Sequence, residues 1–154
     1  MLTAQEQHEI EGELAILPQR RSACIAALKI VQRHRGWASD EALEDIAEFL
    51  QMSCGELESI ATFYNLVFRK PVGRHVILVC NSQSCWMLGE PQIRGALERQ
   101  LEIQLGETTG DGRFTLLPVV CLGDCDHAPA MMVDEDLHHD LTLESLASIL
   151  ERYE

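Results

Sequence analysis

Apolar residues in the first part of the chain recur at three-to-four spacing, the pattern of amphipathic helices. Gly36 is expected to end one long helix, because glycine readily adopts the left-handed backbone that follows a helix. Ser53 and Glu56 form a capping box at the start of a later helix. A Pro- and Gly-containing turn follows at residues 70–73. These signals predict a helical N-terminal domain over residues 1–70.

From residue 71 the pattern changes to short apolar runs separated by polar loops. His75–Cys80 is almost continuously apolar, which predicts a strand covered on both faces. Further strands are expected at 114–120 and 131–133, and helices at about 90–101 and from a Thr142 cap through Arg152. This order predicts a small α/β domain over residues 71–154. The whole chain is therefore expected to be α+β, a helical bundle followed by an α/β domain.

Charge and composition narrow the possible partners. The 154 residues are 46% apolar, ordinary for a globular protein, and the formal net charge is −13. Such an acidic chain is not expected to bind nucleic acid or an anionic membrane surface. No apolar run is long enough to span a bilayer, and the first residues do not resemble a secretory signal. We expect a cytoplasmic protein without direct membrane insertion, whose direct partner is another protein.

Four cysteines in two short pairs carry the candidate chemistry. Cys80 and Cys85 lie in C-N-S-Q-S-C, Cys121 and Cys125 lie in C-L-G-D-C, and each pair follows an apolar run. Cysteines in a reducing compartment are more often metal ligands or buried thiols than disulfides. A cluster with two irons needs two thiolates on each iron, which two separate pairs supply. The spacing favours an iron–sulfur centre.

Other interpretations of the cysteines remain open. A structural zinc site is the main alternative, although zinc ribbons usually use C-x-x-C turns, and a disulfide or simple buried thiols are further ones. A thioredoxin-type dithiol site would need a C-x-x-C motif, which the sequence lacks. Cys24 and Cys54 have no partner at ligand spacing and are expected to be structural.

The remaining polar motifs do not indicate catalysis. No nucleotide-binding glycine motif and no nucleophile with its base occurs in the sequence, so the chain is expected to perform no bond-making chemistry alone. His127 is expected to be a loop residue, and His138, His139 and Asp140 a solvated turn without a role. Trp86 is expected either to shield the metal centre from water or to pack against the fold.

With these residues in view, the chain resembles the thioredoxin-like [2Fe-2S] subunit of bacterial respiratory complex I, the NADH:quinone oxidoreductase E subunit family, over nearly its whole length. The matching stretches are 27–32 with Gly36-Trp37, 61–64, 71–77, the two cysteine pairs, 111–118 and 131–134.

The resemblance implies a thioredoxin-like second domain and one [2Fe-2S] cluster bound by Cys80, Cys85, Cys121 and Cys125. It also implies docking on an NADH-binding FMN flavoprotein subunit, alongside other peripheral-arm subunits, in a complex at the inner membrane. FMN and NADH would belong to that partner, and the cluster would exchange single electrons with the flavin. Related subunits serve NAD-dependent formate dehydrogenases and bidirectional hydrogenases, so these hosts, like a zinc-binding adaptor, remain alternatives.

Two hypotheses concern charged side chains. Asp124 and Asp126 lie beside ligand cysteines, and their negative charge is expected to oppose reduction of an already anionic cluster. Gly123 is expected to let the same loop donate backbone N–H groups to sulfur. Exposed Arg69, Lys70 and Arg74 near the domain boundary are expected to contribute to the docking surface for the flavoprotein.

Overall fold

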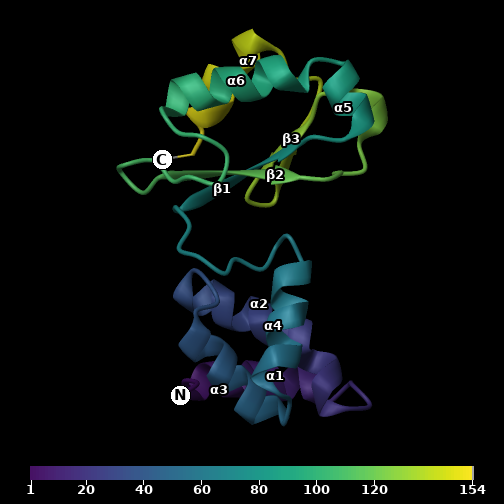
Figure 1. The fold of residues 1–154 in the computed structure, drawn as a ribbon, viewed down its shortest axis with the longest axis vertical. Coiled ribbons are helices and arrows are strands. Elements are labelled where there is room, and N and C mark those ends of the chain that lie inside the picture. Colours follow the sequence, from purple (N-terminus) through teal and green to yellow (C-terminus); the bar gives the residue numbers. More distant parts are fainter. Residues whose placement is uncertain (154) are drawn as a thin grey trace. The chain divides into compact units, whose positions relative to one another are not determined.

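The structure, a computed structural model that describes residues 1–153, divides into two compact units, Met1–Pro71 and Val72–Glu154 (Figure 1). The N-terminal unit is entirely helical. Its elements are α1 (Ala4–Leu14), η1 (Arg20–Ala23), α2 (Cys24–Arg35), α3 (Asp40–Leu50) and α4 (Cys54–Phe63).

Local capping defines the helices of the N-terminal unit. Gly36 ends α2 with a φ of +84°, and Ser53 and Glu56 form the capping box at α4, both as predicted. A second capping box, Thr3 with Glu6, begins α1. The apolar faces pack into one core whose fully buried members include Ile10, Leu28, Leu43, Ile46, Leu50 and Leu57.

The expectation that the Arg69 side chain is exposed is wrong. Its side chain is only 18% exposed and forms ion pairs with Asp40 and Glu58 at 2.6 and 2.9 Å. It also donates to the Ala38 carbonyl oxygen. Arg69 therefore ties the end of the unit to α3 and α4, whereas Lys70 is exposed.

The C-terminal unit packs helices on a four-stranded sheet, an α/β arrangement that makes the chain α+β as predicted. Its elements are β1 (His75–Cys80), α5 (Gln83–Met87), α6 (Glu90–Leu101), β2 (Phe114–Val119), η2 (Cys125–His127), β3 (Met131–Val133), β4 (Asp136–His138) and α7 (Leu143–Leu150). The strand order is β2-β1-β3-β4, with β1 and β2 parallel and the other pairs antiparallel. Helices α6 and α7 cover one face of the sheet (Figure 1).

Most predicted elements of this unit are present, with informative differences. Five of the six residues of β1 are buried, in agreement with its continuous apolar run. Strand β2 ends at Val119, and α7 ends at Leu150 instead of Arg152. Helix α5 and strand β4 were not predicted, because five- and three-residue elements carry too little periodicity.

The expectation of a solvated turn at His138 is also wrong. His138 is buried at the end of β4, and its Nε2 lies 2.7 Å from the Tyr153 hydroxyl. Tyr153 in turn donates to Asp136 at 2.9 Å. Burial is the largest cause that raises the pKa of Tyr153 to about 12, followed by its contact with Asp136. This network attaches the C-terminal segment to the sheet.

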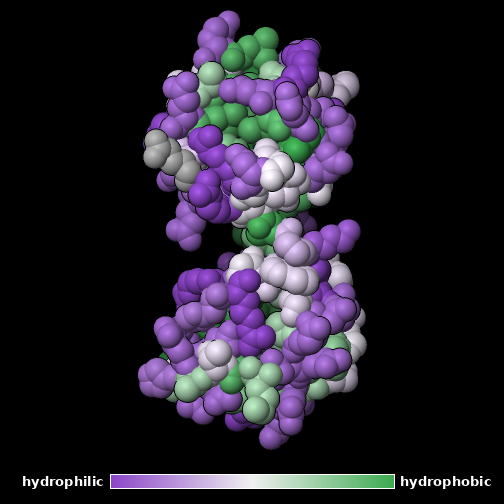
Figure 2. Space-filling view, turned by 90° about the vertical axis from the view of Figure 1, so that its left-hand side faces the viewer, coloured by the Kyte–Doolittle hydropathy of each residue, from purple (hydrophilic) through white to green (hydrophobic). Residues whose placement is uncertain are grey.

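Hydrophilic side chains cover most of the visible face of each unit, in keeping with the net charge of −13 (Figure 2). Within residues 1–153, no helix combines the length and apolar character needed to cross a membrane.

Candidate metal centre

Parallel pairing of β1 and β2 brings the two cysteine segments to one edge of the sheet. In the register of this pair, Cys80 at the end of β1 lies opposite Val119 at the end of β2. Cys121 follows Val119 by two residues, and Cys85 follows Cys80 through the short helix α5. The carboxyl ends of two parallel strands therefore present both pairs at the same place, a common position for sites in α/β sheets.

The two thiols of each pair lie close enough to shift each other's ionisation. Cys80 raises the pKa of Cys85, and Cys121 raises that of Cys125. The two pairs are also linked to one another, because the Leu122 backbone interacts with the Cys80 thiol and the Ser84 hydroxyl with the Cys125 thiol. The structure thus brings the four predicted ligands to one place as two neighbouring pairs of thiols.

The two pairs differ in exposure. Cys80 and Cys85 are 2% and 1% exposed, whereas Cys121 and Cys125 are exposed. The site therefore has a buried side built by β1 and α5, and a side open to solvent built by the loop after β2.

Hydrogen bonds partly prepare this site for anionic sulfur. Burial opposes ionisation of Cys80, but the Ser82 hydroxyl and the backbone groups of Ser82 and Leu122 outweigh it and lower the pKa of the Cys80 thiol. The Ser82 Oγ lies 3.4 Å from the Cys80 Sγ. As predicted, Gly123 adopts a positive φ of +83° and donates its N–H to the Cys121 Sγ at 3.3 Å.

The second thiol of each pair is held in the neutral form. Burial and the neighbouring Cys80 raise the pKa of Cys85, and contact with Cys121 raises that of Cys125. Four thiolates this close repel one another unless a cation lies among them, and metal binding removes this repulsion by displacing the thiol protons. Four sulfur donors are a set for zinc or for a [2Fe-2S] cluster, so the residues present fit the predicted group.

The two carboxylates beside the ligand cysteines differ in their exposure to solvent. Asp126 is 84% exposed, so water and salt screen its charge, whereas Asp124 is 19% exposed and accepts a hydrogen bond from His139. The opposing charge predicted for both carboxylates is therefore expected mainly from Asp124.

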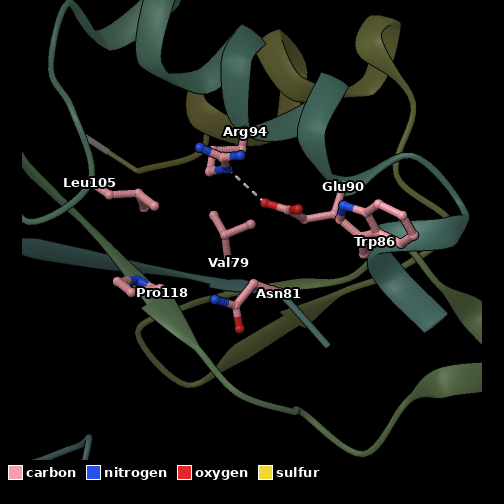
Figure 3. A pocket seen from close by; sticks show the side chains of 7 residues that line it. All are labelled: Val79, Asn81, Trp86, Glu90, Arg94, Leu105 and Pro118. Carbon is pink, nitrogen blue, oxygen red and sulfur yellow. Dashed lines mark hydrogen bonds and ion pairs between the residues drawn. The ribbon is translucent and has the colours of Figure 1, made fainter. Parts of the chain in front are cut away.

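Trp86 does not pack into the core, since its side chain is 60% exposed. It borders a hollow of about 250 Å³ on the sheet side of α5 and α6 (Figure 3). The other residues lining it are Val79, Asn81, Glu90, Arg94, Leu105 and Pro118. Buried Glu90 pairs there at 2.9 Å with partly exposed Arg94, and the two charges neutralise each other.

The two remaining cysteines lie in the N-terminal unit. Cys24 is buried in α2 and contributes to the core, and Cys54 is exposed at the first position of α4.

Known proteins resemble this chain over nearly its whole length. Residues 10–154 match the family described as thioredoxin-like [2Fe-2S] ferredoxin. The E subunit of NADH-quinone oxidoreductase from Pseudomonas aeruginosa is 48% identical over 153 residues, which cover 99% of this chain and 92% of the relative. The protein of the same name from Escherichia coli strain K12 is 51% identical over 152 residues, with the same two shares covered.

Among solved structures, an NAD⁺-reducing [NiFe]-hydrogenase in its air-oxidized state shares the fold with a TM-score of 0.72. The two proteins are 24% identical, and the match covers 85% of this chain and 22% of the hydrogenase chain. On the family match and the two relatives, this chain belongs to the thioredoxin-like [2Fe-2S] ferredoxin family.

Proposed function

We propose that this chain is the electron-transfer subunit of an NADH:quinone oxidoreductase and binds one [2Fe-2S] cluster through Cys80, Cys85, Cys121 and Cys125. The observation that carries the proposal is the convergence of two neighbouring thiol pairs at the carboxyl ends of β1 and β2. When bound there, the cluster supplies a one-electron carrier.

The residues around the site have separate tasks in this proposal. The burial of Cys80 and Cys85 keeps water from one side. The Ser82 hydroxyl and the Gly123 N–H donate to anionic sulfur, which favours added negative charge and offsets the opposing charge of Asp124. The exposed side at Cys121 and Cys125 is the side that a redox partner reaches most closely.

The partner in this proposal is an NADH-binding flavoprotein subunit that holds the FMN, together with other peripheral-arm subunits on the cytoplasmic side of the inner membrane. Exposed apolar side chains beside the ligands support a protein contact. Trp86 and Met87 directly follow Cys85, Val120 directly precedes Cys121, and their side chains are 60%, 69% and 71% exposed. Clustered apolar exposure of this kind is typical of protein interfaces.

Two alternatives are separated by specific observations. The relatives named as NADH-quinone oxidoreductase subunits are 48% and 51% identical to this chain and the hydrogenase is 24% identical, which favours the quinone-linked host over a hydrogenase or a formate dehydrogenase. A zinc-binding adaptor would use the same four sulfur donors. Only the measured iron and zinc content of the purified chain therefore separates it from the proposed function.

The test is low-temperature EPR of the anaerobically purified chain before and after dithionite reduction, with iron and zinc analysis. We expect a silent oxidised sample and one unpaired spin per chain after reduction. Serine variants at the four proposed ligands should lose or alter this signal, whereas Cys24→Ser and Cys54→Ser should keep it. A colourless, EPR-silent chain with stoichiometric zinc would refute the proposal.

The docking contact is tested by co-purification with the flavoprotein subunit. Trp86→Glu and Met87→Glu should weaken retention while leaving the EPR signal unchanged. Leu143→Glu is the matched control, because Leu143 is an apolar side chain of similar exposure, 54%, on α7. Equal retention of all three variants would contradict the assignment of this surface.

A further inference from the structure

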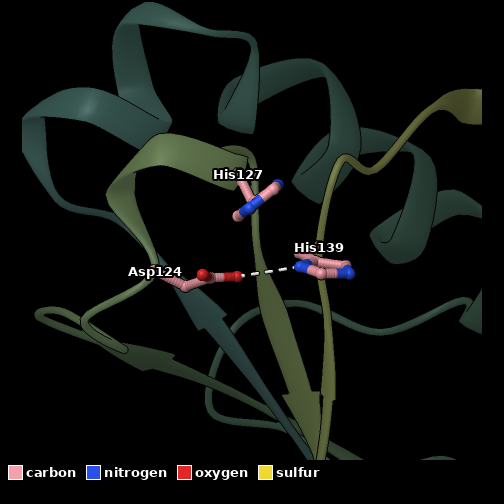
Figure 4. Close-up of side chains that lie close together, drawn as sticks. All are labelled: Asp124, His127 and His139. Carbon is pink, nitrogen blue, oxygen red and sulfur yellow. Dashed lines mark hydrogen bonds and ion pairs between the residues drawn. The ribbon is translucent and has the colours of Figure 1, made fainter.

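Three polar side chains other than the four proposed cysteine ligands converge on one point. Asp124 comes from the loop between Cys121 and Cys125, His127 ends η2, and His139 follows β4 (Figure 4). One ligand atom from each of the three lies within 4.8 Å of the other two. The loop and β4 thus bring a carboxylate and two imidazoles together.

The contacts among these groups are specific. The Nδ1 of His139 lies 3.1 Å from the Oδ2 of Asp124, and the rings of His127 and His139 lie 4.8 Å apart between centroids. The Nδ1 of His127 lies 3.0 Å from the Oδ2 of Asp140. Asp140 therefore orients the His127 ring through its Nδ1, the arrangement in which a carboxylate positions a metal-ligating histidine.

The surrounding charge also favours a cation. Besides Asp124 and Asp140, Asp126 lies 3.7 Å from the Nε2 of His127. The sequence contains no Lys or Arg between Arg113 and Arg152, so no positive side chain of this segment competes for the carboxylates.

We propose that Asp124, His127 and His139 form a binding site for a divalent metal ion of the Zn²⁺ type, separate from the four cysteines. Two imidazoles and one carboxylate suit zinc and its first-row neighbours, with further positions left for water. Zinc bonds of about 2.0–2.2 Å place tetrahedral ligand atoms about 3.4 Å apart, so atoms now up to 4.8 Å apart must approach by about 1.4 Å at most. Since His127 and His139 are about half exposed, rotation of their side chains suffices.

A metal ion bound at this site would act through Asp124 on the [2Fe-2S] cluster of the proposed function. The carboxylate lies between Cys121 and Cys125 in the sequence, and a bound dication would cancel its negative charge and add positive charge beside the sulfur atoms. Positive charge there favours the reduced form and raises the reduction potential. This regulatory part rests on the proposed function, whereas metal binding itself does not.

The site is tested by calorimetric titration of the anaerobically purified, cluster-loaded chain with ZnCl₂. We expect one saturable Zn²⁺ per chain, while the visible absorbance of the cluster stays constant. His127→Ala and His139→Ala should each weaken binding by about tenfold or more, and Asp140→Asn by about tenfold, the effect of losing a ligand or its orienting partner. His8→Ala, an exposed histidine of the N-terminal unit, is the matched control and should bind as the unchanged chain does.

The metal site would be overturned by any of three results. These are equal Zn²⁺ affinity in the His127 and His139 variants, no saturable binding, or Zn²⁺ uptake accompanied by loss of cluster absorbance.

The effect on the reduction potential is tested by an EPR-monitored redox titration, in which Zn²⁺ should raise the midpoint potential of the unchanged chain but not that of His139→Ala. An unchanged midpoint overturns the regulation alone. If the purified chain holds no iron, the proposed function fails. The metal site is still supported in that case if one Zn²⁺ binds per chain and this binding is weakened by the His127 and His139 substitutions.

Discussion

The buried ion pair between Glu6 and Arg35 should be a major stabilising contact of the N-terminal unit. The Glu6 side chain is 1% exposed and accepts from the Nε and Nη2 of Arg35 at 2.7 and 2.8 Å, and from the Thr3 N–H at 2.8 Å. Hydrogen bonding from Arg35 is the largest cause that lowers the Glu6 pKa from 4.5 to about 2, against the opposing effect of burial. We predict that Glu6→Gln, which keeps the size of the side chain, markedly destabilises this unit.

The pKa shift sets the scale of this loss. At about 1.4 kcal/mol per pKa unit, a shift from 4.5 to about 2 corresponds to at most about 3.5 kcal/mol. Arg35 is 28% exposed and solvent screens part of the interaction, so we expect about 2 kcal/mol. Because the folded-state pKa is lowered, this contribution is fully present above about pH 4.5 and disappears as the pH falls towards 2.

The assay is urea unfolding followed by fluorescence of Trp37, a partly buried residue of the N-terminal unit, in a Trp86→Phe background. The free energies of unfolding with and without Glu6→Gln should differ at pH 7 and converge as the pH is lowered below 4.5. Glu9→Gln is the control, because Glu9 pairs at the surface with Arg33, which is 68% exposed, and its loss should have a much smaller effect. A Glu6→Gln difference that does not change with pH would refute the electrostatic explanation.

Three other substitutions test the structural assignments by urea unfolding. Gly73→Ala should destabilise the C-terminal unit by about 1–3 kcal/mol, since its Cβ would lie 3.0 Å from backbone atoms of the neighbouring loop, and an unchanged midpoint would exclude that crowding. Tyr153→Phe should cost about 1–3 kcal/mol because it leaves buried His138 without the hydroxyl partner, and a neutral result would mean that solvent replaces it. Arg69→Ala should lower the free energy of unfolding and Lys70→Ala should not. Equal effects would contradict the structural role of the Arg69 ion pairs.

Local signals account for the part of the fold that was predictable from sequence. Gly36 ends α2 and the Ser53–Glu56 box begins α4, because a left-handed residue and a capping side chain act on their immediate neighbours. The apolar run of β1 predicts its burial for a similar reason, since side-chain spacing along the strand determines which faces are covered. The short elements α5 and β4 were not predictable because five- and three-residue elements carry too little periodicity.

The electrostatic partners were not predictable in this way. Arg69 carries no sequence signal that distinguishes it from exposed Lys70, and only its contacts with Asp40 and Glu58 show that it is a structural residue. Similarly, His139 belongs to a polar run typical of a solvated turn, and only the pairing of β3 with β4 brings it to Asp124.

By itself the sequence determined which chemistry this protein can carry: two short cysteine pairs, each after an apolar run, on an acidic chain. The tertiary structure decided how those groups meet. Parallel pairing of β1 and β2 places Cys80 and Cys121 at the same sheet edge, and the burial of one pair and exposure of the other gives the site an inner and an outer side. The physical reason is that the two kinds of interaction differ in their range along the chain. Side-chain spacing and helix capping act over a few residues, whereas strand register and long-range contacts join residues far apart in the sequence.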